Sequence, residues 1–176
     1  MKIFLNAGHG GTDPGACSKS GTKEADITAK VVSILAARMK ANWYPVECFQ
    51  QTNSVYEVSK VENKSGATLF ISIHCNSFTK PEAHGVETWF CNGSKKGEQI
   101  ASIIQNELVK GTGLTNRGIK ASSTLHVLNK TKAPAVLVEL GFISNPNEEK
   151  LMKEQPEMFS NAIWEAIKKL KNKGLL

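Results

Sequence analysis

Short apolar runs alternate along this chain with longer segments of helical periodicity. The apolar runs predict buried strands at residues 2–7, 68–73 and 135–140, and a shorter strand at residues 125–128. Residues 84–91 alternate between apolar and polar positions, which predicts a further strand. A tight turn is expected directly after the first run, where glycine and proline cluster.

Four segments repeat apolar residues at the spacing of one helix face. Thr22 is expected to cap the first helix, which begins at Lys23 and carries its apolar stripe to Met39. Further helices are expected over residues 55–67, around residues 100–108 and around residues 159–170, and residues 110–123 are expected to form a polar loop. Strands that alternate with helices predict an α/β fold with helices on both faces of a sheet.

The length of 176 residues suits a single domain. We expect this domain to span residues 1–171. The tail at residues 172–176 is equally consistent with a frayed terminus and with the start of a linker to a further C-terminal module.

The chain is basic, with 22 Lys and Arg against 16 Asp and Glu and a net charge of +6. Such an excess favours a polyanionic partner, either nucleic acid, an anionic membrane or an anionic cell wall, and is equally consistent with a role in solubility alone. The lysines of the last helical turn are expected to stay solvated at the helix C-terminus.

Four cysteines are present, and no two of them have CxxC spacing. Cys17, Cys48, Cys75 and Cys91 are therefore expected to be reduced and buried, without a disulfide framework or a zinc knuckle. The N-terminal apolar run is too short for the core of a signal peptide, and no segment is long enough to span a bilayer.

Potentially reactive side chains lie at the ends of three predicted strands. His9 follows the first strand, His74 ends the second, and Glu139 lies within the apolar run AVLVELGF. Glu24 begins the first helix just after the glycine-rich turn. Ligands in α/β sheets gather at the carboxyl ends of strands, and two histidines with one glutamate make a common catalytic zinc set, to which a second carboxylate adds a general base.

Each of these residues also has a structural interpretation. His9 can be a turn residue, His74 a core histidine, and Glu24 a favourable charge at a helix N-terminus. Glu139 is the hardest to explain in this way, because an unpaired buried carboxylate costs several kcal/mol. His84 and His126 are interpreted as structural or as rim residues.

Five blocks of sequence, in this order and spacing, resemble the amidase-3 family of zinc-dependent N-acetylmuramoyl-L-alanine amidases, which occurs in bacterial autolysins and phage endolysins. The resemblance covers nearly the whole chain. Its blocks are NAGHGGTDPGA at residues 6–16, KEAD at 23–26, FISIHCNS at 70–77, GVETWF at 85–90 and PAVLVELGFISN at 134–145.

The resemblance implies one Zn²⁺ bound by His9, Glu24 and His74, with Glu139 as the catalytic carboxylate. It implies a mixed, mostly parallel sheet and cleavage of the amide between N-acetylmuramic acid and the L-alanine of the stem peptide. The chain departs from the family where Asn6 and Ala7 replace an Asp-Pro pair. The loss of a carboxylate at Asn6 removes one candidate partner of a zinc ligand.

The implied partner is bacterial peptidoglycan, with no nucleic acid and no membrane insertion, and any missing C-terminal module would be wall-binding. Asn76 and Arg117 are candidate substrate contacts, although an exposed loop charge is the preferred interpretation of Arg117. The lack of a signal segment favours a phage lysin made in the host cytoplasm, and the alternative is a fragment of a secreted autolysin.

Two rival activities are a zinc peptidase acting on another amide and a non-catalytic wall-binding module. A serine hydrolase is disfavoured because no GxSxG motif occurs.

Overall fold

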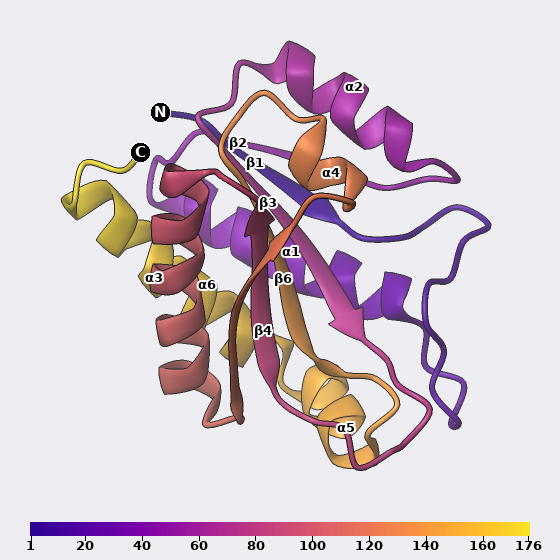
Figure 1. The fold of residues 1–176 in the computed structure, drawn as a ribbon. Helices are drawn as coiled ribbons and strands as arrows, with labels where there is room; N and C mark the ends of the chain where they lie inside the picture. Colours follow the sequence, from indigo (N-terminus) through magenta and orange to yellow (C-terminus); the bar gives the residue numbers. More distant parts are fainter.

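The computed structural model describes residues 1–176 and contains one six-stranded sheet with helices on both faces (Figure 1). The elements in chain order are β1 (Ile3–Ala7), α1 (Glu24–Ala41), β2 (Val46–Gln50), α2 (Val55–Ser65), β3 (Leu69–Asn76), β4 (Val86–Cys91), α3 (Lys95–Thr112), β5 (Asn116–Ser122), α4 (His126–Asn129), β6 (Ala135–Phe142), α5 (Pro146–Glu154) and α6 (Pro156–Asn172). The strand order is β2-β1-β3-β6-β4-β5, and β4 runs antiparallel to β6 while the other neighbours are parallel. The predicted α/β fold with a mixed, mostly parallel sheet is confirmed.

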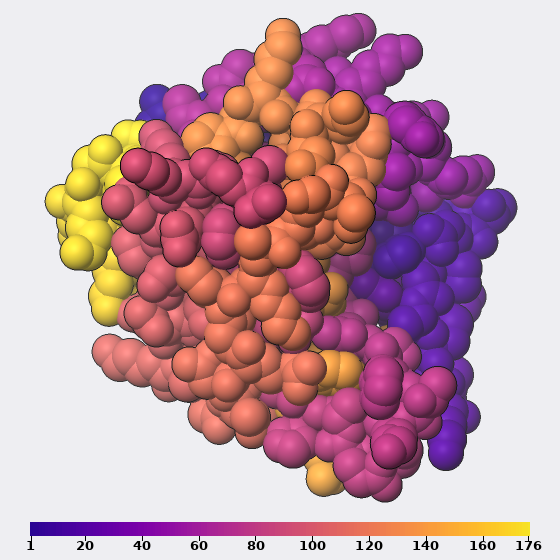
Figure 2. Space-filling view, in the orientation of Figure 1, coloured from indigo at the N-terminus to yellow at the C-terminus, as the bar shows by residue number.

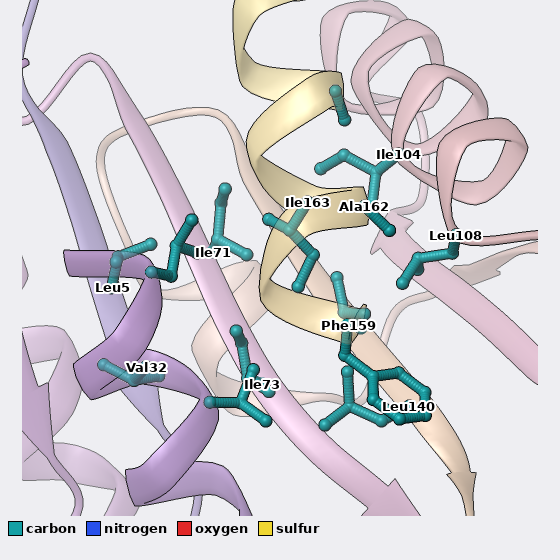
Figure 3. Packing of buried hydrophobic residues seen from close by; sticks show 14 of the residues in the cluster. Leu5, Val32, Ile71, Ile73, Ile104, Leu108, Leu140, Phe159, Ala162 and Ile163 are labelled. Atoms are coloured by element: carbon teal, nitrogen blue, oxygen red, sulfur yellow. The ribbon is translucent and has the colours of Figure 1, made fainter. Parts of the chain in front are cut away.

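The two faces of the sheet are covered unequally. Odd-numbered residues of β1 and β3 point to the larger cluster, which packs against α1, α3 and α6 (Figure 3). Even-numbered residues such as Phe4 and Phe70 point to a smaller cluster beneath α2 and α4. Because side chains alternate along a strand, His74 and Glu139 also lie on this thinly covered face, where a substrate can reach them.

Two predictions on the second half of the chain are wrong. The stretch 110–123 contains the last turn of α3 and the edge strand β5. The residues of β5 are mostly exposed or half-buried, and they give no apolar pattern. Residues 125–128 belong to the single-turn helix α4, whose buried Val127 and Leu128 are too few to show a helical period.

The first helix also begins differently from the prediction. Its N-cap is Lys23, and no side chain caps it. The hydroxyl of Thr22 instead donates a hydrogen bond to Glu149 on α5, which draws this side chain away from the end of the helix.

All four cysteines are free, as predicted, but the predicted burial is confirmed only for Cys75. Cys75 is buried and Cys91 half-buried, whereas Cys17 and Cys48 are exposed. Cys48 lies on the edge strand β2, which has a neighbour on one side only, so an apolar sequence context did not imply burial there.

The chain ends on the face of the sheet that the larger cluster covers. Beyond α6, Leu175 and Leu176 pack half-buried against the larger cluster. None of the helices combines the length and the apolar character needed to cross a bilayer.

Candidate active site

His9 lies in the turn that follows β1 and has a strained backbone. Its φ is 61°, a left-handed conformation that is uncommon for residues other than glycine and that often marks functional sites. The Nδ1 atom lies 2.8 Å from a carboxylate oxygen of Asp13, which orients the ring. Gly8 permits the close approach of the second histidine, since a Cβ atom there would lie 2.3 Å from Cε1 of His74.

Glu24, at the start of α1, connects the two histidines. One carboxylate oxygen accepts a hydrogen bond from the backbone N–H of Cys75 at 2.9 Å and lies 3.0 Å from Nδ1 of His74 and 3.4 Å from Nε2 of His9. The other oxygen accepts from the N–H of Ala16 at 2.9 Å. Burial acts to raise the pKa of Glu24, but the hydrogen bonds to the histidines and to the backbone outweigh it and hold the pKa well below the usual range.

His74 belongs to β3 and is held from behind by two polar side chains. Its Nε2 lies 3.1 Å from Oγ of Ser72, and the amide of Asn6 on β1 donates to the same hydroxyl at 2.8 Å. Asn6, the position that departs from the family pattern, is therefore linked to His74 through the hydroxyl of Ser72. The amide oxygen of Asn6 is enclosed and has no hydrogen-bond partner.

The donor atoms of His9, Glu24 and His74 all lie within 4.8 Å of one another. This set of two imidazoles and one carboxylate fits a catalytic zinc ion, which has three protein ligands and one open position. The electrostatic potential is suited to a cation, because the carboxylate of Glu24, with that of Asp13, overcomes the effect of burial and raises the pKa of His9 to about 9.

Glu139 lies beside this cluster in the middle of the sheet. It is opposite His74 on β3 and opposite Glu87 on β4. Part of the side chain is exposed, but Oε2 is enclosed and has no hydrogen-bond partner. Burial, followed by the charges of Glu24 and Glu87, raises the pKa of Glu139 to about 8.

Glu87 is the centre of a polar cluster on the other side of Glu139. Its carboxylate accepts hydrogen bonds from Arg117 at 2.7 Å, Lys120 at 2.6 Å and the side-chain amide of Asn76 at 3.0 Å. Burial acts to raise the pKa of Glu87, but Lys120 and Arg117 outweigh it and lower the pKa. Arg117 is thus neither a free loop charge nor part of the His-Glu-His cluster; it lies on β5, with its guanidinium 4.8 Å from the ring centre of Phe142.

The remaining histidines lie outside the cluster of donors. His84 has its Nδ1 2.6 Å from the backbone oxygen of Glu82, and His126 on α4 lies 3.0 Å from the hydroxyl of Ser59. Both contacts are consistent with the structural interpretation.

Three residues that the sequence reasoning did not single out support the site. Asp13 and Ser72 orient the two histidines, and Glu149 on α5 accepts hydrogen bonds from the hydroxyls of the loop before α1, namely those of Ser18, Ser20 and Thr22. Asp13 is part of the first block of the resemblance. Glu149 gives no signal in the sequence, because its partners lie more than a hundred residues away.

The chain matches a family model described as Amidase_3, N-acetylmuramoyl-L-alanine amidase, over residues 3–169. It is 34% identical over 171 residues to a probable cell wall amidase, LytH, of Staphylococcus epidermidis, an alignment that covers 94% of this chain and 57% of that protein. The chain thus spans little more than half the length of this relative.

Solved structures agree with this assignment. The catalytic domain of CwlV, an N-acetylmuramoyl-L-alanine amidase from Bacillus (Paenibacillus) polymyxa var. colistinus, superposes with a TM-score of 0.88 at 27% identity, covering 98% of this chain and 99% of that one. An N-acetylmuramoyl-L-alanine amidase from Clostridium difficile 630 gives a TM-score of 0.90 at 25% identity, covering 97% and 96%. The chain therefore belongs to the amidase-3 family of N-acetylmuramoyl-L-alanine amidases.

Proposed function

We propose that the chain is a zinc-dependent amidase that cleaves peptidoglycan between N-acetylmuramic acid and the L-alanine of the stem peptide, at the bacterial cell wall. The observation that carries the proposal is the position of Glu139, an enclosed carboxylate with an unpartnered oxygen directly beside a compact His-Glu-His cluster. A buried carboxylate in such a position is destabilising and is therefore a candidate for proton transfer.

His9, Glu24 and His74 would hold the zinc ion. When bound, zinc supplies Lewis acidity to the scissile carbonyl and to a water molecule. Asp13 keeps the ring of His9 in place, and Ser72 does the same for the ring of His74. Such partners of metal ligands commonly change metal affinity or activity by 10- to 100-fold when mutated.

Glu139 would accept the proton of the attacking water and pass it to the leaving amine of L-alanine. A carboxylate with a raised pKa suits both steps, because it can take up a proton near neutral pH and release it again. One group then acts first as base and then as acid, as amide hydrolysis requires, since an amine is a poor leaving group until it is protonated.

Asn76 and Arg117 would contact the substrate next to Glu139. Each uses part of its hydrogen-bonding capacity on Glu87, and the side chain of Arg117 remains 35% exposed. Ion pairing holds the guanidinium in one orientation, so that an anionic or carbonyl group of the stem peptide would meet a fixed donor.

The test combines metal analysis with identification of the products. We expect one zinc per chain, loss of wall lysis in chelator, and recovery when Zn²⁺ is added back. The products should carry a new amine on L-alanine and a free lactyl carboxylate on muramic acid. New amines at another residue of the stem peptide would indicate a peptidase, and wall binding without any new amine would indicate a non-catalytic module.

A further inference from the structure

Trp43, in the turn between α1 and β2, is the most exposed large apolar side chain of the molecule. The residue is 93% exposed, and its φ of 59° lies in the left-handed region. The N–H of Trp43 bonds to the carbonyl of Lys40, and the N–H of Tyr44 bonds to that of Met39. This is the Schellman pattern that ends a helix, and Trp43 occupies the left-handed position where glycine is usual.

The left-handed conformation of Trp43 destabilises the fold, and burial of the side chain does not compensate for it. A left-handed conformation of a non-glycine residue costs roughly 1–2 kcal/mol, and an indole ring that is almost fully exposed buries no apolar area in return. A glycine would end the helix at lower cost. The tryptophan is therefore better explained by a contact with another molecule than by the stability of the fold.

The surroundings of Trp43 are basic. Helices α1 and α6 run in the same direction, because Ser160 bonds to the carbonyl of Val31 and Tyr44 packs on Trp164 with ring centres 4.8 Å apart. The C-termini of both helices consequently lie at one end of the molecule. We call this end the tryptophan pole, defined as Trp43 and Tyr44 with Lys40, Lys168, Lys171 and Lys173.

Few carboxylates neutralise the tryptophan pole. Lys171 lies over the ring of Tyr44, with its ammonium group 4.5 Å from the ring centre. Of the nearby acids, Glu47 is paired with Lys2 outside the pole, and Glu165 is paired with Lys168 of the pole. Lys40, Lys171 and Lys173 have no carboxylate partner. Lys173 lines a groove with Lys95 and Glu98 of α3, which lies beside the C-terminal segment (Figure 2), so that the positive charge extends around this end of the molecule.

The tryptophan pole faces away from the candidate active site. Pro45 bonds to Ile3 at the start of β1, whereas His9 follows the other end of this strand. At about 3.3 Å per residue, the five residues of β1 place its two ends roughly 15 Å apart. A surface that held the tryptophan pole would thus leave the His-Glu-His cluster open on the opposite side.

We propose that the tryptophan pole docks on an anionic phospholipid bilayer, with the indole of Trp43 at the level of the headgroups. Tryptophan favours the membrane interface, where its ring is partly dehydrated and its N–H still finds acceptors. Lysines near an anionic surface contribute additional attraction. The docking is peripheral and requires no spanning helix. It would direct the active site towards the peptidoglycan layer that overlies the membrane.

The experiment measures sedimentation with vesicles of phosphatidylglycerol and phosphatidylcholine in equal parts, and with vesicles of phosphatidylcholine alone. The central variant is Trp43→Gly, because glycine suits the backbone and the melting temperature should stay the same or rise. The matched control is Phe78→Ser, which removes the aromatic ring of a 55% exposed residue just beyond the carboxyl end of β3, on the other side of the molecule. A double variant, Lys40→Gln with Lys171→Gln, tests the charge.

Wild-type protein and Phe78→Ser should bind the anionic vesicles alike and leave neutral vesicles unbound. Trp43→Gly should weaken binding about tenfold, and the double lysine variant should weaken it by a similar factor. The proposal is overturned if wild-type protein ignores anionic vesicles, or if Trp43→Gly binds them as tightly as wild type. It is equally overturned if purified wall, but not vesicles, is bound in a way that depends on Trp43, since the partner would then be a wall polymer.

Discussion

Replacing Glu139 by glutamine tests the proposed proton transfer separately from the proposed metal binding. Glutamine keeps the size of the side chain, so no cavity arises, but it cannot take up a proton at neutral pH. His9, Glu24 and His74 remain unchanged, and we expect one zinc per chain in Glu139→Gln. The loss of a positioned base should lower the rate of wall lysis by about 10²–10⁴.

The same substitution should stabilise the metal-free protein. The pKa of Glu139 rises from 4.5 to about 8 on folding, so the unfolded chain loses this proton at a lower pH than the folded chain. Stability linked to this proton is complete below pH 4.5 and is lost as the pH rises towards 8. At pH 7 the loss is at most about 3 kcal/mol, and glutamine should recover about 1–3 kcal/mol of it, because it carries no charge to bury.

The assay compares both proteins on the same samples. Zinc content and lysis rate are measured on the zinc-loaded proteins. Urea unfolding of the metal-free proteins is followed between roughly pH 5 and pH 8, the range between the unfolded and folded pKa of Glu139. Wild-type lysis by Glu139→Gln would remove Glu139 from the mechanism. An inactive variant without zinc would make Glu139 a ligand instead. Parallel stability curves across this pH range would refute the raised pKa.

Three further substitutions test the supports of the site. Gly8→Ala should displace His74 and reduce zinc content, since the new Cβ would lie 2.3 Å from its ring; unchanged zinc would contradict this. Glu149→Gln should cost about 1–2 kcal/mol in urea unfolding at neutral pH. Hydroxyl hydrogen bonds outweigh burial and lower the pKa of Glu149, so this difference should vanish in acid as the wild-type carboxylate protonates. Arg117→Gln should raise KM on peptidoglycan fragments more than it lowers kcat, and an unchanged KM would exclude a substrate contact.

The apolar pattern predicted those parts of the molecule in which burial is extreme. Glu139 stood out because it interrupts a buried strand, and His74 because it ends another. The edge strand β5 was missed, because exposed strands carry no such contrast. The mixed direction of the sheet came from the resemblance, since no residue pattern distinguishes β4 from a parallel strand.

The contacts that hold the proposed metal ligands could not be predicted from the sequence, for a different reason. The bond between Glu149 and the loop before α1 depends on how α5 packs, and the chain of contacts from Asn6 through Ser72 to His74 depends on the register of β1 with β3. The left-handed backbone of Trp43 was equally unpredictable. Only glycine or asparagine at a position signals that conformation in a sequence, and this position holds tryptophan.

The site is built half on the sheet and half on the segment between β1 and α1. His74 and Glu139 belong to β3 and β6, each paired on both sides, whereas His9 is carried by a turn. Amide hydrogens in strands paired on both sides should exchange with solvent only on global unfolding, but those around His9 should exchange through local opening. Without a bound metal, the segment that carries His9 should therefore become more mobile, whereas His74 and Glu139 should keep their positions in the sheet. Glu139 would then already be in place when His9 returns to its position.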